Sequence, residues 1–80
     1  MPHVARHGPY RFLFFSNNGR EPPHVHVKRD RSEARFWLVP VALARNRRFN
    51  QHELRRIEAI VRARRLRFLE VWNAFFTSRA

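Results

Sequence analysis

The stretch HVHVKRDRSEARFWLV, residues 24–39, decides the expected fold. His24–Lys28 alternates polar and apolar residues strictly, which is the pattern of a half-buried β-strand. Asp30–Ser32 has the composition of a turn, and Glu33–Val39 predicts a further strand that Pro40 stops. The two strands are therefore expected to form an antiparallel hairpin.

The apolar residues of this hairpin indicate its register. Pairing Lys28 with Arg35 across a turn over residues 29–33 gathers the apolar side chains on one face, as a buried sheet face requires. This register places Val27 opposite Phe36 and Val25 opposite Leu38. The other face then carries His24, His26, Lys28, Arg35 and Trp37.

The preceding segment predicts one more strand. Tyr10–Ser16 is aromatic and lacks helical spacing, which favours a strand that is apolar on both faces. Asn17–Gly19 supplies a turn, and the pair Pro22-Pro23 holds the chain extended before the hairpin. The sequence therefore predicts a three-stranded antiparallel sheet over residues 9–39.

After a linker at residues 40–49, the apolar period changes to that of a helix. Asn50 is a suitable N-cap with Glu53 three residues later, and an apolar stripe follows it. One continuous helix would turn Arg64 and Arg65 into its apolar arc, so we expect a bend. The predicted helices cover residues 50–63 and 66–77. The fold class is thus α+β, a single domain of residues 1–80 with three strands and then two helices packed on one face.

The composition indicates the class of partner. The 80 residues carry 17 Lys and Arg against six Asp and Glu, a net charge of +11, yet 44% are hydrophobic, which excludes a disordered polycation. The absence of cysteine excludes disulfides and thiolate chemistry. The longest apolar run, Phe12–Phe15, is too short for a membrane span, so we expect a cytoplasmic protein without a membrane partner. Its expected partner is polyanionic.

His24 and His26 are the candidate catalytic residues. Side chains at i and i+2 of a strand point the same way, so the two imidazoles can act on one group. One interpretation is acid/base cleavage of RNA at a 2′-hydroxyl, which needs no cofactor. A second is a metal site, for which His3, His7, Glu21 and His52 are the available further ligands. In the third, both rings are structural. We expect no metal.

The candidate nucleic-acid contacts are basic residues and one tryptophan. Arginine forms bidentate contacts with phosphate, and an indole stacks on bases. A tryptophan on a small sheet is equally a surface for a partner subunit, including a second copy of the chain. The candidates are Lys28, Arg35, Trp37, Arg55, Arg62, Arg64 and Arg65.

Several of these segments resemble a known family. The pieces Glu21–Val27 (EPPHVHV), Phe36–Leu38, Glu53-Leu54 and Trp72-Asn73 occur in order at compatible spacings. With them, nearly the whole chain resembles the small prokaryotic family described as domain of unknown function 4160. The resemblance implies a partner encoded beside it, in a pair of the toxin–antitoxin type.

Three functions follow as hypotheses. The first is a basic module of such a pair that binds nucleic acid, preferentially RNA. The second is a metal-independent endoribonuclease toxin with His24 and His26 as its acid/base pair. The third is an interaction subunit that binds a small acidic protein through its basic surface.

Overall fold

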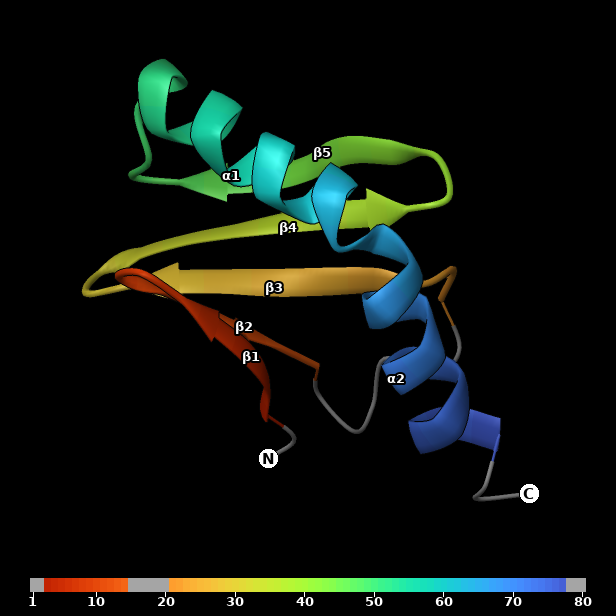
Figure 1. Ribbon diagram of the computed structural model, residues 1–80. Coiled ribbons are helices and arrows are strands. Elements are labelled where there is room, and N and C mark those ends of the chain that lie inside the picture. The colour runs from red at the N-terminus through yellow and green to blue at the C-terminus, as the bar shows by residue number, and fades with distance from the viewer. Residues whose placement is uncertain (1–2, 15–20, 78–80) are drawn as a thin grey trace.

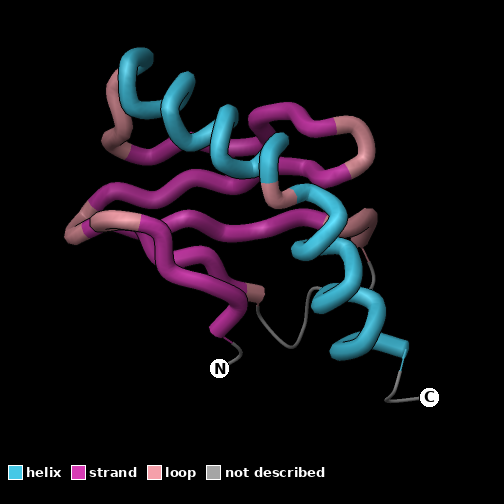
Figure 2. Tube along the Cα trace, viewed as in Figure 1, coloured by secondary structure: helices cyan, strands magenta, loops and turns pink. Residues whose placement is uncertain are grey.

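The chain forms a five-stranded antiparallel sheet with two helices against it, in a computed structural model that describes residues 3–14 and 21–77 (Figure 1). Each strand pairs with the next one along the chain, so the sheet is a meander. The helices follow the last strand and lie in front of the sheet in Figures 1 and 2. In order, the elements are β1 (His3–His7), β2 (Tyr10–Leu13), β3 (His24–Arg29), β4 (Ser32–Leu38), β5 (Val41–Arg47), α1 (Gln51–Ala63) and α2 (Arg65–Thr77).

The α+β class and the two helices are confirmed, but the prediction of three strands is wrong. β1 precedes the expected sheet and pairs with β2 across a turn in which Gly8 has a φ of +59°. β5 occupies most of the expected linker at residues 40–49. Pro40 lies in the two-residue connection between β4 and β5. Proline has no backbone N–H to donate, but a residue in a turn does not need that hydrogen bond. The end of the expected strand Tyr10–Ser16 and the expected turn at residues 17–19 lie outside the described residues.

The β3–β4 hairpin has a register two residues away from the predicted one. Lys28 pairs with Glu33 rather than with Arg35, because the turn is the short one at residues 30–31, where Asp30 has a φ of 53°. Aspartate tolerates this left-handed conformation better than most residues. Since side chains alternate with a period of two, the shift leaves every side chain on its predicted face.

The apolar face of the sheet packs against both helices. Phe12 of β2 contacts Phe68 of α2, with ring centroids 5.3 Å apart, and Phe14 contacts Trp72 edge-on at 5.1 Å. Such aromatic pairs add stabilisation beyond the apolar area that they bury. The fully buried members of this core are Tyr10, Phe12, Phe14, Val25, Val27, Ala34, Phe36, Leu38, Ile57, Val61 and Phe68.

The two helices are separated at Arg64, within the expected bend. Its backbone leaves the helical region at φ −109° and ψ 14°, while its N–H still bonds to the carbonyl of Ile60. The bend keeps the Arg64 side chain exposed and lets the Nε of Arg65 donate to the Leu38 carbonyl at 2.7 Å. At the other end of α1, the Asn50 side chain accepts from the Glu53 N–H at 2.8 Å, as an N-cap does.

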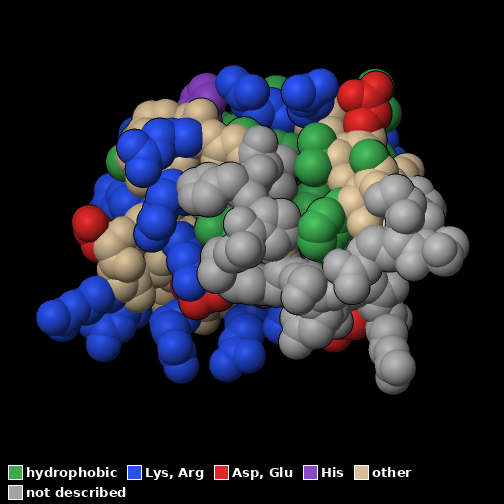
Figure 3. All heavy atoms as spheres, turned by 90° about the horizontal axis from the view of Figure 1, so that it is seen from below, with side chains coloured by type: hydrophobic (Ala, Val, Ile, Leu, Met, Phe, Trp, Pro, Cys, Tyr) green, Lys and Arg blue, Asp and Glu red, His purple; other side chains and the backbone are tan. Residues whose placement is uncertain are grey.

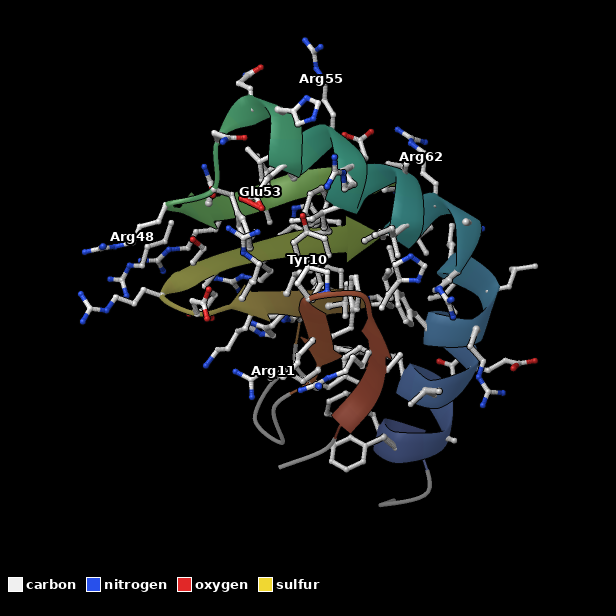
Figure 4. The ribbon with its side chains drawn as sticks, turned by 60° about the vertical axis from the view of Figure 1, so that its left-hand side comes forward. Tyr10, Arg11, Arg48, Glu53, Arg55 and Arg62 are labelled. Atoms are coloured by element: carbon white, nitrogen blue, oxygen red, sulfur yellow. The ribbon has the colours of Figure 1, made fainter. Side chains whose placement is uncertain are left out.

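The first turn of α1 is held to the sheet by a polar cluster. The Glu53 carboxylate accepts from the Tyr10 hydroxyl at 3.2 Å and pairs with Arg29 of β3 at 2.7 Å. Figure 4 shows Tyr10 and Glu53 pointing toward one another. Burial of Tyr10 raises its pKa, and the Glu53 charge acts in the same direction. Glu53 therefore connects α1 to two strands.

Replacing this carboxylate is expected to destabilise the fold. Glu53→Ala leaves the buried Tyr10 hydroxyl and the Arg29 guanidinium without their acceptor, which costs about 2 kcal/mol of unfolding free energy. Urea unfolding measures the loss. Tyr10→Phe removes one hydrogen bond and keeps the ion pair, so it should cost about half as much. A Glu53→Ala protein as stable as the parent would show that the cluster does not hold α1.

Candidate anion-binding face of the sheet

Cationic side chains from four neighbouring strands share the sheet face that is turned away from the core. Residues that pair directly across antiparallel strands lie on the same face, which places Arg11 beside Lys28, and Arg35 beside Arg45. Seen from below, Lys and Arg side chains lie along the left and lower margins of the molecule and also at its top (Figure 3). We call the sheet face that is turned away from the core the basic sheet face and define it by Arg11, Lys28, Arg35, Arg45 and Arg47.

A β-bulge places the last two of these residues on this face. Phe36 pairs with Leu43, whereas Arg35 pairs with Arg45, so Ala44 is an extra residue on β5. Such an extra residue shifts the alternation of the strand by one position. Leu43 therefore lies on the core face, while Arg45 and Arg47 lie on the opposite one. Without the bulge, all three side chains would point to the same side.

The basic sheet face contains a hollow of about 180 Å³ on β3, β4 and β5. Its lining residues are His26, Glu33, Ala34, Arg35, Arg45 and Arg47. The Arg35 guanidinium is held from one side, since its Nη1 donates to the Glu21 carboxylate at 3.3 Å. Within residues 3–14 and 21–77, no carboxylate forms an ion pair with Arg45 or Arg47. The hollow is therefore suited to an anion.

His26 forms part of the floor of the hollow and is 8% exposed. The pKa of His26 is lowered to about 4, mainly by burial and also by its electrostatic interactions with His24 and Arg35, while Glu33 opposes the shift. The Glu33 carboxylate lies 3.6 Å from the His26 Nδ1. At neutral pH the imidazole is therefore uncharged, and the guanidinium groups supply the positive charge of the site.

This pKa predicts a stability that depends on pH. Below pH 6.5 the unfolded chain binds a proton at His26 that the folded protein does not accept until about pH 4. Stability should therefore fall as the pH decreases from 6.5 to 4, by up to about 1.4 kcal/mol per pH unit. Urea unfolding from pH 7.5 to 4.5 measures this slope, and His26→Gln should flatten it. Equal slopes for the two proteins would contradict the prediction.

His24 lies on the same side of the sheet as His26 but has no exposed surface. Its Nδ1 is 2.9 Å from the Pro22 carbonyl, and its Nε2 is 3.6 Å from the Glu21 carboxylate. Its ring centroid lies 5.5 Å from that of Trp37 and 5.3 Å from that of Trp72. These contacts favour the structural interpretation of His24, because a group without solvent access does not meet a substrate from solution.

The predicted nucleic-acid contacts divide between two sides of the molecule. Lys28, Arg35 and Trp37 are half-buried on the side of the basic sheet face. Arg55 borders a separate hollow with Phe36 and Leu43, on the helix side. The structure therefore brings three of the seven candidates together and places the four helix arginines elsewhere.

Three of the helix arginines already have partners within the protein. Arg62 donates to Glu58 at 2.8 Å, and Arg64 donates to the Nδ1 of His7 at 3.1 Å. Arg65 bonds the Leu38 carbonyl, as described above. Figure 4 shows Arg55 and Arg62 pointing outward from α1.

The site residues predicted from the sequence do not include Arg11, Arg45 and Arg47. Arg11 occupies an alternate position of a predicted strand, so its side of the sheet could have been assigned from the pattern. Arg45 and Arg47 fall in the segment that was interpreted as a linker. The apolar residues Val41 and Leu43, two apart after Pro40, were the signal for a strand there.

Two other features bear on the hypotheses. Among the described residues, no three His, Asp or Glu side chains come together in a way that could hold a metal ion. Neither α1 nor α2 has the length and apolar character needed to cross a membrane, in the part of the chain that the structure describes.

Fold and site together define a small α+β protein, in which a five-stranded meander carries two helices on one face and a cationic hollow on the other. Residues 10–73 match the family described as Domain of unknown function (DUF4160), and the chain belongs to this family. The resemblance of the motif residues 21–27 to that family is thereby confirmed. No curated protein and no solved structure matches the chain.

Proposed function

We propose that the protein binds RNA through the basic sheet face, as the basic component of a toxin–antitoxin-like pair in the cytoplasm of a prokaryote. The observation that carries this proposal is the hollow with Arg35, Arg45 and Arg47 around it. Guanidinium groups form paired hydrogen bonds with phosphate oxygens and remain charged at every physiological pH. A nucleic-acid backbone supplies such phosphates in series.

Unneutralised charge on this face supports the proposal. Some arginines elsewhere in the protein are paired with carboxylates, as Arg29 is with Glu53 and Arg62 with Glu58. Arg45 and Arg47 have no such partner among the described residues. Arg45 and Arg47 line the same hollow and their like charges repel one another, so an external polyanion stabilises them.

The shape of the face supports single-stranded RNA in particular. Sequence-tolerant recognition of single strands combines a cationic surface that follows the backbone with an aromatic ring that stacks on a base. Arg11, Lys28 and Arg35 cross the sheet from β2 to β4, and the half-exposed Trp37 lies on the same side. Trp37 is accordingly the proposed stacking residue, and these cations are the proposed phosphate contacts.

The salt dependence of binding tests this proposal. With about four phosphate contacts on a single strand, the logarithm of the association constant should fall with a slope of about −3 against the logarithm of the salt concentration. Fluorescence anisotropy with a labelled single-stranded RNA measures this slope, and a single-stranded DNA of the same sequence tests the preference for RNA. Absence of RNA binding at about 0.15 M salt would contradict the proposal.

The same experiment separates the other two hypotheses. Equal binding of a polyglutamate peptide would favour an acidic protein partner over RNA. Cleavage of the RNA in the presence of EDTA would favour the metal-independent endoribonuclease. The geometry gives that reaction little support, because His24 is fully buried and His26, which is a neutral imidazole at pH 7, lacks the second proton that a general acid donates.

A further inference from the structure

We propose that the hollow binds a terminal phosphate monoester, so that the protein prefers RNA ends that carry a phosphate over ends that carry a hydroxyl. This inference rests on the proposed RNA binding and names the chemical group that occupies the hollow. The remaining cations of the basic sheet face, Arg11 and Lys28, would contact the internal phosphodiesters of the same strand.

The cationic groups of the hollow attract a phosphate monoester more strongly than a phosphodiester. Its lining contains three arginines and one carboxylate, that of Glu33, while His26 is uncharged at neutral pH. Because the Glu21 carboxylate also pairs with Arg35, these charged groups leave one net positive charge, and the two guanidinium groups without an ion pair among the described residues are those of Arg45 and Arg47. A phosphate monoester carries about 1.5 to 2 negative charges at pH 7, because its second pKa is about 6. An internal phosphodiester carries one negative charge and is therefore attracted less strongly by the guanidinium groups of Arg45 and Arg47.

The number of donors also matches a monoester. Three guanidinium groups approach the hollow from two strands, Arg35 from β4 and both Arg45 and Arg47 from β5. A monoester presents three unesterified oxygens, whereas a diester presents two and must continue the chain on both sides. The hollow has a volume of about 180 Å³, and its lining includes the neutral His26.

One donor of a residue that lines the hollow lacks an acceptor. The Nε of Arg35 is buried and has no hydrogen-bond partner among the described residues, although Nη1 of the same guanidinium contacts Glu21. A buried donor without a partner costs free energy. A phosphate oxygen that accepts a hydrogen bond from this donor recovers that cost on binding.

The test compares RNA oligonucleotides of one sequence that differ only at their ends. Oligonucleotides with a 5′- or 3′-phosphate are titrated against the version with two hydroxyl ends, by competition in fluorescence anisotropy. We expect a phosphorylated end to bind about tenfold tighter at pH 7.5, and the advantage to shrink at pH 5.5 as the monoester takes up its second proton. His26, with a pKa of about 4, stays uncharged over this interval.

Two variants separate the hollow from the rest of the basic sheet face. Arg47→Ala should abolish the advantage of the phosphorylated end, since it removes a lining guanidinium. Lys28→Ala, which lies on the same face but outside the hollow lining, should weaken both oligonucleotides equally and keep the advantage. If Lys28→Ala also reduced the advantage of the phosphorylated end, the assignment of the monoester to the hollow would be overturned.

The outcomes distinguish this inference from the proposed function. Equal, salt-dependent binding of phosphorylated and hydroxyl-ended RNA would overturn the inference and leave RNA binding intact. No binding of either oligonucleotide would overturn both. A mononucleotide that binds as tightly as the phosphorylated oligonucleotide would support the monoester site and overturn RNA as the source of the phosphate.

Discussion

Reversing the charges of Arg45 and Arg47 together, as Arg45→Glu/Arg47→Glu, is expected to weaken RNA binding by about 100-fold or more at 0.1 M salt. Both side chains border the hollow, and neither has a carboxylate partner in the described part of the chain. The substitution removes two phosphate contacts and places two carboxylates where phosphates would bind. The salt slope should also decrease by about 1.4, which corresponds to two contacts on a single strand.

The matched control carries the same change in net charge on α1. Arg55→Glu/Arg62→Glu alters two exposed side chains that point away from the sheet (Figure 4) and should weaken binding by less than about tenfold. Circular dichroism checks that both variants fold. An equal loss in the two variants would show that binding follows net charge, and a larger loss in the control would assign the contact to the helix arginines.

The largest loss of stability is expected for Phe68→Ala. Phe68 has no exposed surface, and its ring lies 5.3 Å from that of Phe12, so it joins α2 to β2. Truncating a buried phenylalanine removes its apolar contacts and leaves a cavity, which costs about 3–5 kcal/mol. A domain of this size has a total stability at the low end of about 5–15 kcal/mol, so the variant should be close to unfolded at 37 °C.

A neighbouring residue provides the control for this experiment. Leu66 lies on the same helix but is 71% exposed, so Leu66→Ala should change the unfolding free energy by less than about 0.5 kcal/mol. Thermal and urea unfolding of both variants measure the difference. Similar stabilities for the two would show that α2 does not pack on the sheet through Phe68.

The local chemistry of the sequence was sufficient for several elements. The strict alternation in His24–Lys28 predicted both the strand and the side on which each residue lies, because strand geometry has a fixed period of two. Asn50 and Glu53 predicted the start of α1, since capping depends on neighbours within one turn. The charge of Arg64 and Arg65 predicted the division into two helices, because buried unpaired arginines are costly.

Other features were not predictable from local patterns. The burial of His24 depends on Trp72, which lies far along the chain and meets the ring only when α2 packs against the sheet. The low pKa of His26 likewise depends on its burial in the folded sheet. Proline at position 40 suggested the end of the sheet, whereas in the structure the chain turns there and adds β5.

The candidate site shows the division between sequence and tertiary structure most clearly. The sequence by itself determined that the chain is strongly basic and that Lys28, Arg35 and Trp37 lie on one face, because charge and alternation belong to the residues themselves. Only the tertiary structure decided that Arg45 and Arg47 join that face. If the alternation continued without interruption from Leu43, Arg45 and Arg47 would point to the core side. The extra residue Ala44 forms a bulge against β4 and turns both side chains to the opposite face. Whether a strand forms such a bulge depends on its pairing partner, so the physical reason lies in the assembled sheet.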